Sequence, residues 1–246
     1  MSRLGGKTYW IVGASAGIGR AVSMEMSRKG AKLILSARSE DDLNDLSREC
    51  SGSTRVVPVD IADDTSVAEA AEKVGEIDGL VFLAGVYWPM KTQEWDAEQA
   101  VKMADINFTG CVRVLGHVVP KMVARDRGHI VLTGSLAGFR GLPGSIGYGA
   151  SKAAVMNLAE AMAIDLKGTG VEVQLVNPGF VKTRLTDKND FKMPFIMEPE
   201  AAAREIVEHM HDDAFAKSFP RAFASMFKAG RALPNWAWNR LASRGG

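Results

Sequence analysis

The sequence has little cysteine, no marked excess of charge of either sign and no long apolar run. Its 246 residues include only two cysteines, Cys50 and Cys111, too few for a disulfide framework or a cysteine-rich metal site. The formal net charge of +1 argues against a nucleic-acid-binding protein that acts through its overall charge. No apolar run approaches the roughly 20 residues of a membrane span, and residues 1–7 do not have the pattern of a signal peptide. We therefore expect a cytoplasmic protein with neither a metal ion nor a nucleic acid as partner.

The remaining composition is that of an ordinary globular protein, with 46% hydrophobic and 24% charged residues. Short apolar runs alternate with segments of helical spacing, and the joints between them are short. This alternation predicts a single α/β domain built on a doubly wound parallel sheet of six or seven strands, with helices on both faces. The expected strands lie at residues 8–12, 31–37, 55–60, 79–85, 129–134 and 171–176, with a short seventh strand at most within 214–219.

Tyr148 and Lys152 lie four residues apart, so a helix places them on one face, one turn from each other. A tyrosine hydroxyl with its usual pKa of roughly 10 is a poor acid or base at neutral pH, and a nearby cation lowers that pKa toward neutrality. Such a pair alone is more often part of a solvated helix surface. Its surroundings favour catalysis, because Ser135 comes thirteen residues earlier, at the end of the apolar run 129–134.

A glycine-rich turn follows the first apolar run. Gly13, Gly17 and Gly19 come directly after residues 8–12 and open a segment of helical spacing. A strand, a glycine turn and a helix in this order are typical of nucleotide-binding folds, where the backbone approaches a pyrophosphate. Together with the serine, tyrosine and lysine, this turn resembles the short-chain dehydrogenase/reductase superfamily, up to about His211. The resemblance implies a Rossmann-type fold.

The resemblance also implies a catalytic set of Asn107, Ser135, Tyr148 and Lys152. In this set Tyr148 is the general acid or base, and Ser135 donates a hydrogen bond to the reacting oxygen. Lys152 is expected to lower the pKa of Tyr148 and to bind the nicotinamide ribose. Asn107 is expected to hold a water near the lysine and so to complete a proton relay.

A nicotinamide dinucleotide is the implied cofactor. Arg38 comes directly after the second expected strand. At this position in dinucleotide-binding folds an arginine accommodates the 2′-phosphate of NADP. Glu40, Asp41 and Asp42 follow closely, so NAD stays the less favoured alternative. No metal is required. The residues expected to contact the cofactor are Gly13, Ser15, Gly17, Ile18, Gly19, Arg38, Asp60, Ile61, Ala84, Gly85, Asn107, Tyr148, Lys152, Pro178, Gly179, Val181 and Thr183.

One segment departs from the family's pattern. Where relatives have two asparagines followed by alanine and glycine, this chain has Phe82, Leu83, Ala84 and Gly85. Ala84 and Gly85 match the family's pattern, so the backbone can still pass close to the cofactor. Because both amide side chains are missing, we expect a more apolar core at this point rather than a loss of catalysis.

The implied function is that of an NADP-dependent oxidoreductase, which transfers hydride between the nicotinamide and a carbonyl or secondary alcohol. Tyr87, Trp88, Phe139, Leu142 and residues 191–197 favour an apolar small-molecule substrate without identifying it. An NAD-dependent alcohol dehydrogenase and a non-catalytic NADP-binding regulator on the same fold are the alternatives. The complete catalytic set counts against a regulator, which needs no acid–base relay. By analogy with relatives we expect a homodimer or homotetramer.

The end of the chain matches the family least. We expect residues 1–213 to form the catalytic domain and residues 214–246 to form a basic, aromatic extension packed on it. The extension contains no Asp or Glu but has six basic residues, Lys217, Arg221, Lys228, Arg231, Arg240 and Arg244. Basic residues mixed with aromatics can bind an anionic membrane surface. We favour packing over the expected substrate loop, residues 185–197, or against a neighbouring subunit, because Pro220, Gly230 and Pro234 interrupt the segment.

Overall fold

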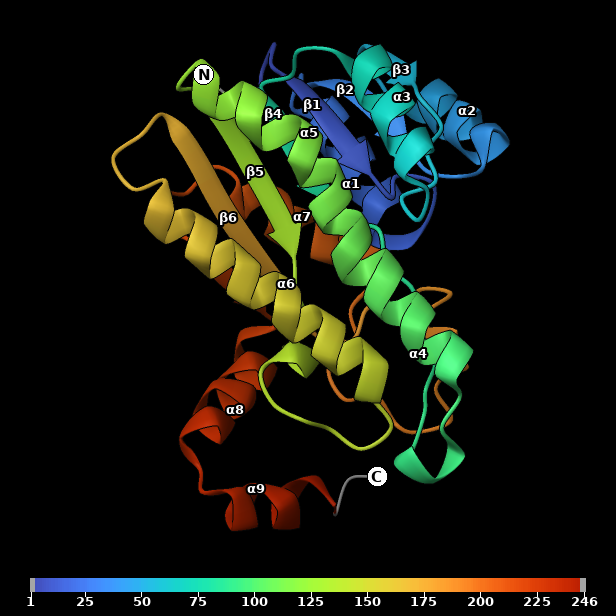
Figure 1. The fold of residues 1–246 in the computed structure, drawn as a ribbon, viewed down its shortest axis with the longest axis vertical. Helices are drawn as coiled ribbons and strands as arrows, with labels where there is room; N and C mark the ends of the chain where they lie inside the picture. The colour runs from blue at the N-terminus through green and yellow to red at the C-terminus, as the bar shows by residue number, and fades with distance from the viewer. Residues whose placement is uncertain (1–2, 244–246) are drawn as a thin grey trace.

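Short runs of buried apolar residues form seven strands, all parallel, in the order β3-β2-β1-β4-β5-β6-β7 (Figure 1). The computed structural model describes residues 3–243. The parallel sheet confirms the predicted fold class. The strands are β1 (Thr8–Val12), β2 (Lys32–Ser36), β3 (Thr54–Val56), β4 (Gly79–Phe82), β5 (Gly128–Thr133), β6 (Val171–Pro178) and β7 (Ala216–Phe219).

Helices cover both faces of this sheet (Figure 1). They are α1 (Gly17–Arg28), α2 (Glu40–Glu49), α3 (Asp64–Val74), α4 (Ala97–Ala104), α5 (Gly110–Ala124), α6 (Ile146–Asp165), α7 (Pro199–His209), α8 (Arg221–Ala232) and α9 (Asn235–Ala242). Short helical turns join some of these elements: η1 (Thr92–Glu94), the π-helical η2 (Asp105–Thr109), η3 (Leu136–Gly138) and η4 (Thr186–Lys188).

The sheet separates two hydrophobic cores, because successive strand residues point to opposite faces. Trp10 and Val12 of β1 belong to the core that also contains apolar residues of α3, α5 and α6. Tyr9 and Ile11 belong to the other core, which contains apolar residues of α1, α2 and α7. Burial on both faces explains why the strands are continuous apolar runs in the sequence.

The strand order reverses between β1 and β4, which are neighbours in the sheet although two other strands lie between them in sequence. In open parallel sheets the loops at such a point leave a crevice outside the carboxyl ends of the strands. The glycine turn after β1 and the Ala84–Gly85 segment after β4 meet at this crevice. The topology therefore places the two predicted cofactor segments side by side.

The structure differs from the expected element boundaries in several places. β3 ends at Val56 rather than at Asp60. Pro58, which has no N–H to donate to a neighbouring strand, lies in the segment that follows β3. The helix α2 was not predicted, although Ser39 caps its first turn by accepting a hydrogen bond from the Asp42 N–H.

The largest difference lies in the C-terminal extension, where α8 and α9 are helices of 12 and 8 residues. Pro220 and Pro234 do not interrupt them, because each lies at the position just before a helix begins. Gly230 lies inside α8, so the expectation that it breaks the segment is wrong. Both helices lie beyond the carboxyl ends of the strands (Figure 1). The predicted boundary at residue 213 stays a prediction, and β7 lies just beyond it.

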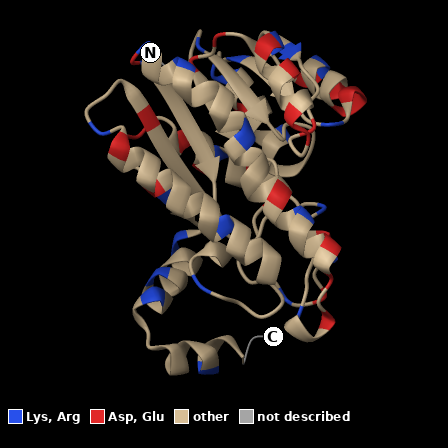
Figure 2. Ribbon diagram, viewed as in Figure 1, with Lys and Arg blue, Asp and Glu red and all other residues tan. Residues whose placement is uncertain are grey.

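Charge is distributed unevenly over this architecture. Figure 2 shows Lys and Arg but no Asp or Glu on α8 and α9, whereas α2 and α3 carry many acidic residues. Arg244, the last predicted basic residue of the extension, lies outside the described residues. Over residues 3–243 we find no helix with the length and apolarity that crossing a membrane requires.

Candidate active site

The glycine turn after β1 is shaped by backbone contacts that leave no room for a side chain. Gly13 has a φ of +91°, and a Cβ at this position would lie 2.5 Å from the backbone nitrogen of Ala84. A Cβ on Gly19 would lie 1.9 Å from the carbonyl oxygen of Gly13. The turn can therefore close onto the start of α1 and onto the segment after β4 only with glycine at both positions.

A cleft of about 400 Å³ opens above this turn. Eleven of the predicted cofactor residues line it: Gly13, Ser15, Gly17, Ile18, Gly19, Arg38, Asp60, Ile61, Ala84, Gly85 and Thr183. The start of α1 faces the cleft, with no acidic residue in its first turn and no side-chain cap. Its first N–H groups are thus available to an anion, so the donor set and the shape both fit a dinucleotide pyrophosphate.

Arg38 lies on the rim of the same cleft, directly after β2. It is exposed, and within residues 3–243 its guanidinium has no hydrogen bond or ion pair. Ser39 and Asp42, the next polar residues on this rim, contact each other at the start of α2. The arginine is therefore free to pair with an anionic group in the cleft.

Beside the cleft lies a second pocket of about 120 Å³, with Ser135 and Tyr148 in its wall. Ser135 follows β5, and Tyr148 lies in the first turn of α6. Burial raises the pKa of Tyr148, and a hydrogen bond from the Ser135 side chain partly opposes that rise. The pKa thus moves opposite to the direction expected from the sequence, because burial is the larger of these two effects. A raised pKa keeps the phenol protonated at neutral pH.

Lys152 is buried one turn further along α6. Its Nζ donates a hydrogen bond to the carbonyl oxygen of Thr133 at 2.9 Å and lies 5.8 Å from the centroid of the Tyr148 ring. Burial lowers the pKa of Lys152 to about 8. The ammonium is therefore close to the Tyr148 ring and hydrogen-bonded to the sheet.

Asn107 connects this lysine to the segment after β4. It lies in the π-helical turn η2 between α4 and α5, a distortion often found at functional sites. Its Oδ1 accepts from the Val86 N–H at 2.7 Å, while its Nδ2 donates to the Val86 carbonyl and to Ser151 Oγ, both at 3.0 Å. A Cβ on Gly85 would lie 3.3 Å from Asn107 Oδ1 and 3.6 Å from Lys152 Nζ. Lys152 and Asn107 therefore lie directly beside Gly85, which lines the cleft.

Residues 178–183, at the end of β6 and directly after it, lie partly along the pocket and the cleft and partly in the protein interior. Gly179 lines the pocket with Tyr148, and Thr183 lines the cleft. Pro178 and Val181 are buried, and Val181 forms an isolated bridge with Met197. The structure thus brings the catalytic set and most cofactor residues together, but it places the side chains of Pro178 and Val181 in the protein interior.

A family model described as short chain dehydrogenase matches residues 7–193. The chain belongs to the short-chain dehydrogenases. Among curated relatives, an uncharacterized oxidoreductase of Myxococcus xanthus is 34% identical, with 99% of each chain covered. A 3-oxoacyl-[acyl-carrier-protein] reductase of Thermotoga maritima is 35% identical, with 76% of this chain and 78% of the relative covered.

Solved structures agree with this assignment. A short-chain dehydrogenase from Sphingobium yanoikuyae in complex with NADPH has a TM-score of 0.82 and 26% identity, covering 96% of this chain and 95% of its own. A short-chain dehydrogenase/reductase from Burkholderia phymatum in complex with NAD has a TM-score of 0.84 at 24% identity, with 93% and 94% covered, and shows the fold alone.

The structure shows how this short-chain dehydrogenase accommodates Phe82 and Leu83 in place of its family's asparagine pair. Phe82 is 1% exposed and belongs to the core beneath α3, α5 and α6. Leu83 is partly buried and packs against the opposite core. Two apolar side chains therefore replace the two amides, and the backbone still passes close to Gly13.

The outer wall of the Tyr148 pocket contains Tyr87, one of the aromatic residues expected to favour an apolar substrate, and two side chains of the C-terminal extension. Tyr87 packs edge-on against Tyr148, with ring centroids 5.0 Å apart, and its hydroxyl donates to Asn189 Oδ1 at 3.0 Å. Phe223 and Phe227 of α8 line the same pocket. Aromatic residues were noted in both segments, but their convergence on one tyrosine depends on the fold and has no signature in the chain.

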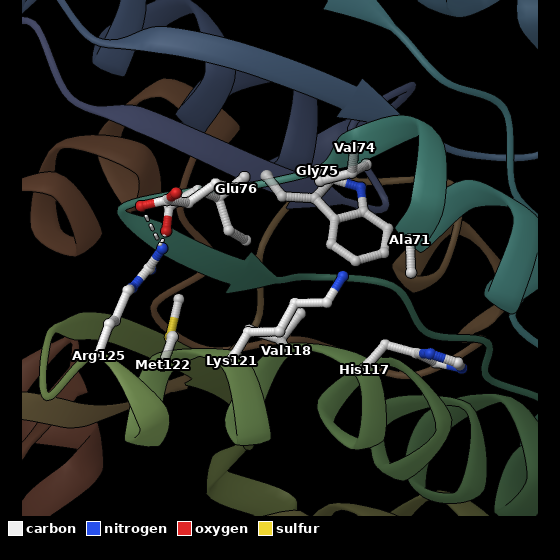
Figure 3. Close-up of a pocket in the computed structure, with 11 residues that line it drawn as sticks. Ala71, Val74, Gly75, Glu76, His117, Val118, Lys121, Met122 and Arg125 are labelled. Atoms are coloured by element: carbon white, nitrogen blue, oxygen red, sulfur yellow. Dashed lines mark hydrogen bonds and ion pairs between the residues drawn. The ribbon is translucent and has the colours of Figure 1, made fainter.

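A further small cavity of about 20 Å³ lies between α3, α5 and the segment before β4. Figure 3 shows Arg125, which follows α5, reaching toward Glu76, and the two form an ion pair at 2.9 Å. This cavity lies at the amino ends of the strands, opposite the catalytic set. It has room for about one water molecule and is not a candidate substrate site.

Proposed function

We propose that this short-chain dehydrogenase transfers hydride between NADP(H) and a carbonyl or secondary alcohol of an apolar small molecule. The observation that carries the proposal is the meeting of Ser135 and Tyr148 in one buried pocket that adjoins the glycine-lined cleft. When bound, the nicotinamide supplies or accepts the hydride. The cleft lies beside the acid–base group, so a substrate held at Tyr148 reaches the edge of the cofactor site.

Tyr148 acts as the proton donor in the reductive direction. Its raised pKa keeps the phenol protonated until negative charge develops on the substrate oxygen. The Ser135 hydroxyl lies in the same pocket wall and donates to that oxygen, which stabilises the developing alkoxide. The balance is one hydride to the carbonyl carbon and one proton to its oxygen, which gives the alcohol.

Lys152 and Asn107 restore the proton to Tyr148. Lys152 lies within reach of the phenol, and its lowered pKa of about 8 allows it to exchange a proton near neutrality. Asn107 fixes the backbone of Val86 beside the lysine through a pair of hydrogen bonds. Both residues therefore hold the proton path beside the cleft.

The preference for NADP is supported by Arg38. Its exposed guanidinium lies on the cleft rim, directly after β2, and is available to a 2′-phosphate. The similar enzyme from Sphingobium yanoikuyae was solved with NADPH, whereas the one from Burkholderia phymatum was solved with NAD. Assembly into a homodimer or homotetramer stays a prediction, which a mass measurement in solution would test.

Consumption of NADPH, followed by its absorbance with a panel of ketones and aldehydes, tests the proposal. The matched control is Tyr148→Phe, which keeps the ring and removes the proton. Turnover should fall at least ~10²-fold in the variant, the low end for loss of an acid–base group, while NADPH affinity changes little. A variant that keeps near-normal turnover would contradict the assignment of Tyr148. NADPH binding without turnover of any carbonyl compound or alcohol would favour the non-catalytic regulator.

A further inference from the structure

The pocket at Tyr148 has a wall without formal charge. Within the described chain, its lining contains no Asp, Glu, Lys, Arg or His. A substrate carboxylate or phosphate in this pocket would lose its hydration without gaining a counter-charge.

Several basic residues lie near the lining residues in sequence, but none belongs to the pocket lining. Arg184, Lys192 and Lys228 are exposed and adjacent to lining residues, whereas Lys188 and Arg140 are held by contacts outside the pocket. Lys188 Nζ donates to the Tyr87 carbonyl at 2.7 Å and lies 4.5 Å from the centroid of the Trp88 ring. Arg140 donates to the carbonyls of Gly230 and Leu233 on the side of the C-terminal helices. Neither cation belongs to the pocket wall, so neither is placed to pair with an anionic substrate.

Aromatic rings form much of the wall opposite Tyr148. Phe180 lies 5.7 Å from Phe223, and Phe223 lies 5.0 Å from Phe227 in a perpendicular arrangement, all measured between ring centroids. Phe191 packs edge-on against Phe180 at 5.9 Å. Exposed ring faces and edges of this kind favour another aromatic ring by about 0.5–1.5 kcal/mol beyond the area that is buried.

The size of the pocket limits what it can hold. Its volume is about 120 Å³. Apolar cavities of roughly 150 Å³ bind benzene, so this pocket takes one ring or a branched alkyl group of similar size.

Polar groups are concentrated at the reacting end. Ser135 and Tyr148 face the position of a substrate oxygen, whereas Thr186 donates to the Val181 carbonyl at 2.8 Å and Asn189 accepts from Tyr87. The Ser145 hydroxyl is a further neutral group in the wall. The pocket is thus polar at the catalytic oxygen and apolar beyond it.

We propose that the substrate is an uncharged ketone, or the corresponding secondary alcohol, with one phenyl-sized group on the carbonyl carbon. The inference rests on the proposed function and names its substrate class. It separates this chain from enzymes that act on carboxylates or carrier-bound acyl groups. Acetophenone and 1-phenylethanol are suitable probes, and phenylglyoxylate and mandelate are the matched probes that carry a carboxylate beside the same ring.

Two measurements on the full-length protein test the substrate class. The first compares kcat/KM for acetophenone and phenylglyoxylate with NADPH, and we expect acetophenone to be favoured at least ~10²-fold because the carboxylate has no partner. The second compares the binding of 1-phenylethanol and mandelate to the protein with NADP by calorimetry, with the same preference expected. Equal or reversed preference in either measurement overturns the inference. Turnover of a short acyl thioester in preference to acetophenone also overturns it, although the proposed hydride transfer would stand.

Binding of 1-phenylethanol over mandelate without any turnover would support the pocket's selectivity while contradicting the proposed function. A pair of variants on α8 isolates the effect of charge. Phe227→Arg places a cation in the pocket wall and should move the acetophenone-to-phenylglyoxylate ratio at least ~10-fold toward the carboxylate. Met226→Arg adds the same charge at the adjacent position, which is 58% exposed, and should leave the ratio unchanged. Equal effects of the two variants would contradict the inference.

Discussion

Trp238 of α9 donates its indole N–H to the carbonyl oxygen of Gly141 at 2.8 Å. This hydrogen bond joins the last helix to the loop between η3 and α6, ninety-seven residues earlier in the chain. The same loop supplies Leu142 and Pro143 to the wall of the Tyr148 pocket. The C-terminal helices therefore hold a wall of the candidate substrate pocket as well as contributing to it.

Arg140 also connects this loop to the C-terminal helices. Its guanidinium donates to the carbonyls of Gly230 and Leu233 at 2.5 and 2.6 Å and to Asn235 Oδ1 at 2.6 Å. It also lies 5.4 Å from the centroid of the Trp238 ring. One side chain thus satisfies acceptors at the end of α8 and the start of α9, which would otherwise be free.

We expect Arg140→Met to raise the KM for the carbonyl substrate by roughly 3- to 30-fold and to leave NADPH affinity unchanged. The reason is that the loss of these hydrogen bonds, each worth about 1 kcal/mol net, frees the Leu142–Pro143 wall but does not touch the glycine-lined cleft. Steady-state kinetics and a cofactor titration check both parts. Lys228→Met, which removes an exposed charge from α8, is the control and should change neither quantity. An unchanged KM in Arg140→Met would show that the connection does not shape the pocket.

The cofactor preference depends on Arg38 in our proposal. Arg38→Asp removes the partner of the 2′-phosphate and adds a repelling charge, so NADPH affinity should fall roughly 10²-fold while NADH affinity is kept. Fluorescence titration with both cofactors measures this. Lys32→Asp, at the other end of β2, makes the same charge change away from the cleft and should preserve the preference. Equal affinities for the two cofactors in the unaltered protein would already contradict the prediction.

The sheet could be predicted from the sequence because strands buried on both faces leave continuous apolar runs, as at residues 8–12 and 79–82. The extension could not, since Pro220 and Pro234 were interpreted as interruptions although proline is well suited to the start of a helix. Gly230 is tolerated inside α8 because Trp238 occupies the space of its missing side chain: a Cβ there would lie 2.5 Å from the indole ring. A contact of this kind becomes visible only in three dimensions.

The candidate site, too, could be predicted only in part from the sequence. The spacing of Ser135, Tyr148 and Lys152 predicted that these residues lie together, since Ser135 follows a recognisable strand and the other two lie on one helix face. The pKa of Tyr148 could not be inferred from that spacing, because it depends on burial and on the hydrogen bond with Ser135.

The close packing around Gly13, in the turn that lines the cleft, predicts that a substitution there lowers stability. Gly13→Ala would place a Cβ against the backbone of Ala84 in a left-handed conformation, which costs roughly 1–2 kcal/mol before the clash is counted. We expect the free energy of unfolding to fall by about 2–4 kcal/mol and NADPH affinity to fall at least ~10-fold. Gly116→Ala is the control, because Gly116 lies in α5 with nothing within 4 Å of its Cβ position. It should stabilise the protein by roughly 0.5–1 kcal/mol. Equal unfolding midpoints for the two variants would contradict the predicted clash.

A buried chain of hydrogen bonds crosses the sheet away from the site. Tyr9 OH and His129 Nδ1 are 2.9 Å apart, as are His129 Nε2 and Gln174 Oε1. Gln174 Nε2 donates to the carbonyls of His209 and Asp212, so its Oε1 faces the histidine. The network therefore assigns the proton of neutral His129 to Nε2, with Nδ1 accepting from Tyr9.

This network predicts a loss of stability in mild acid. Burial lowers the pKa of His129 from 6.5 to about 4, and the hydrogen bond that His129 donates to Gln174 only partly opposes the change. The unfolded chain binds a proton near pH 6.5, whereas the folded chain does so only near pH 4, so stability falls as the pH decreases through this window. From pH 7 to pH 5 the contribution of this group is a loss of about 2 kcal/mol. Burial also lowers the pKa of His209, which acts in the same direction.

Urea unfolding at several pH values between 4 and 7 measures this slope. The comparison variant is His129→Gln, which keeps a polar side chain that can bond to Tyr9 and Gln174 but cannot be protonated. We expect it to be less stable at pH 7, because its hydrogen bonds are less well placed, and to lose about 2 kcal/mol less than the unaltered protein between pH 7 and pH 5. His117→Gln is the control and should retain the full slope, since His117 lies outside the network. Parallel curves for His129→Gln and the unaltered protein would show that the buried histidine does not determine the acid sensitivity.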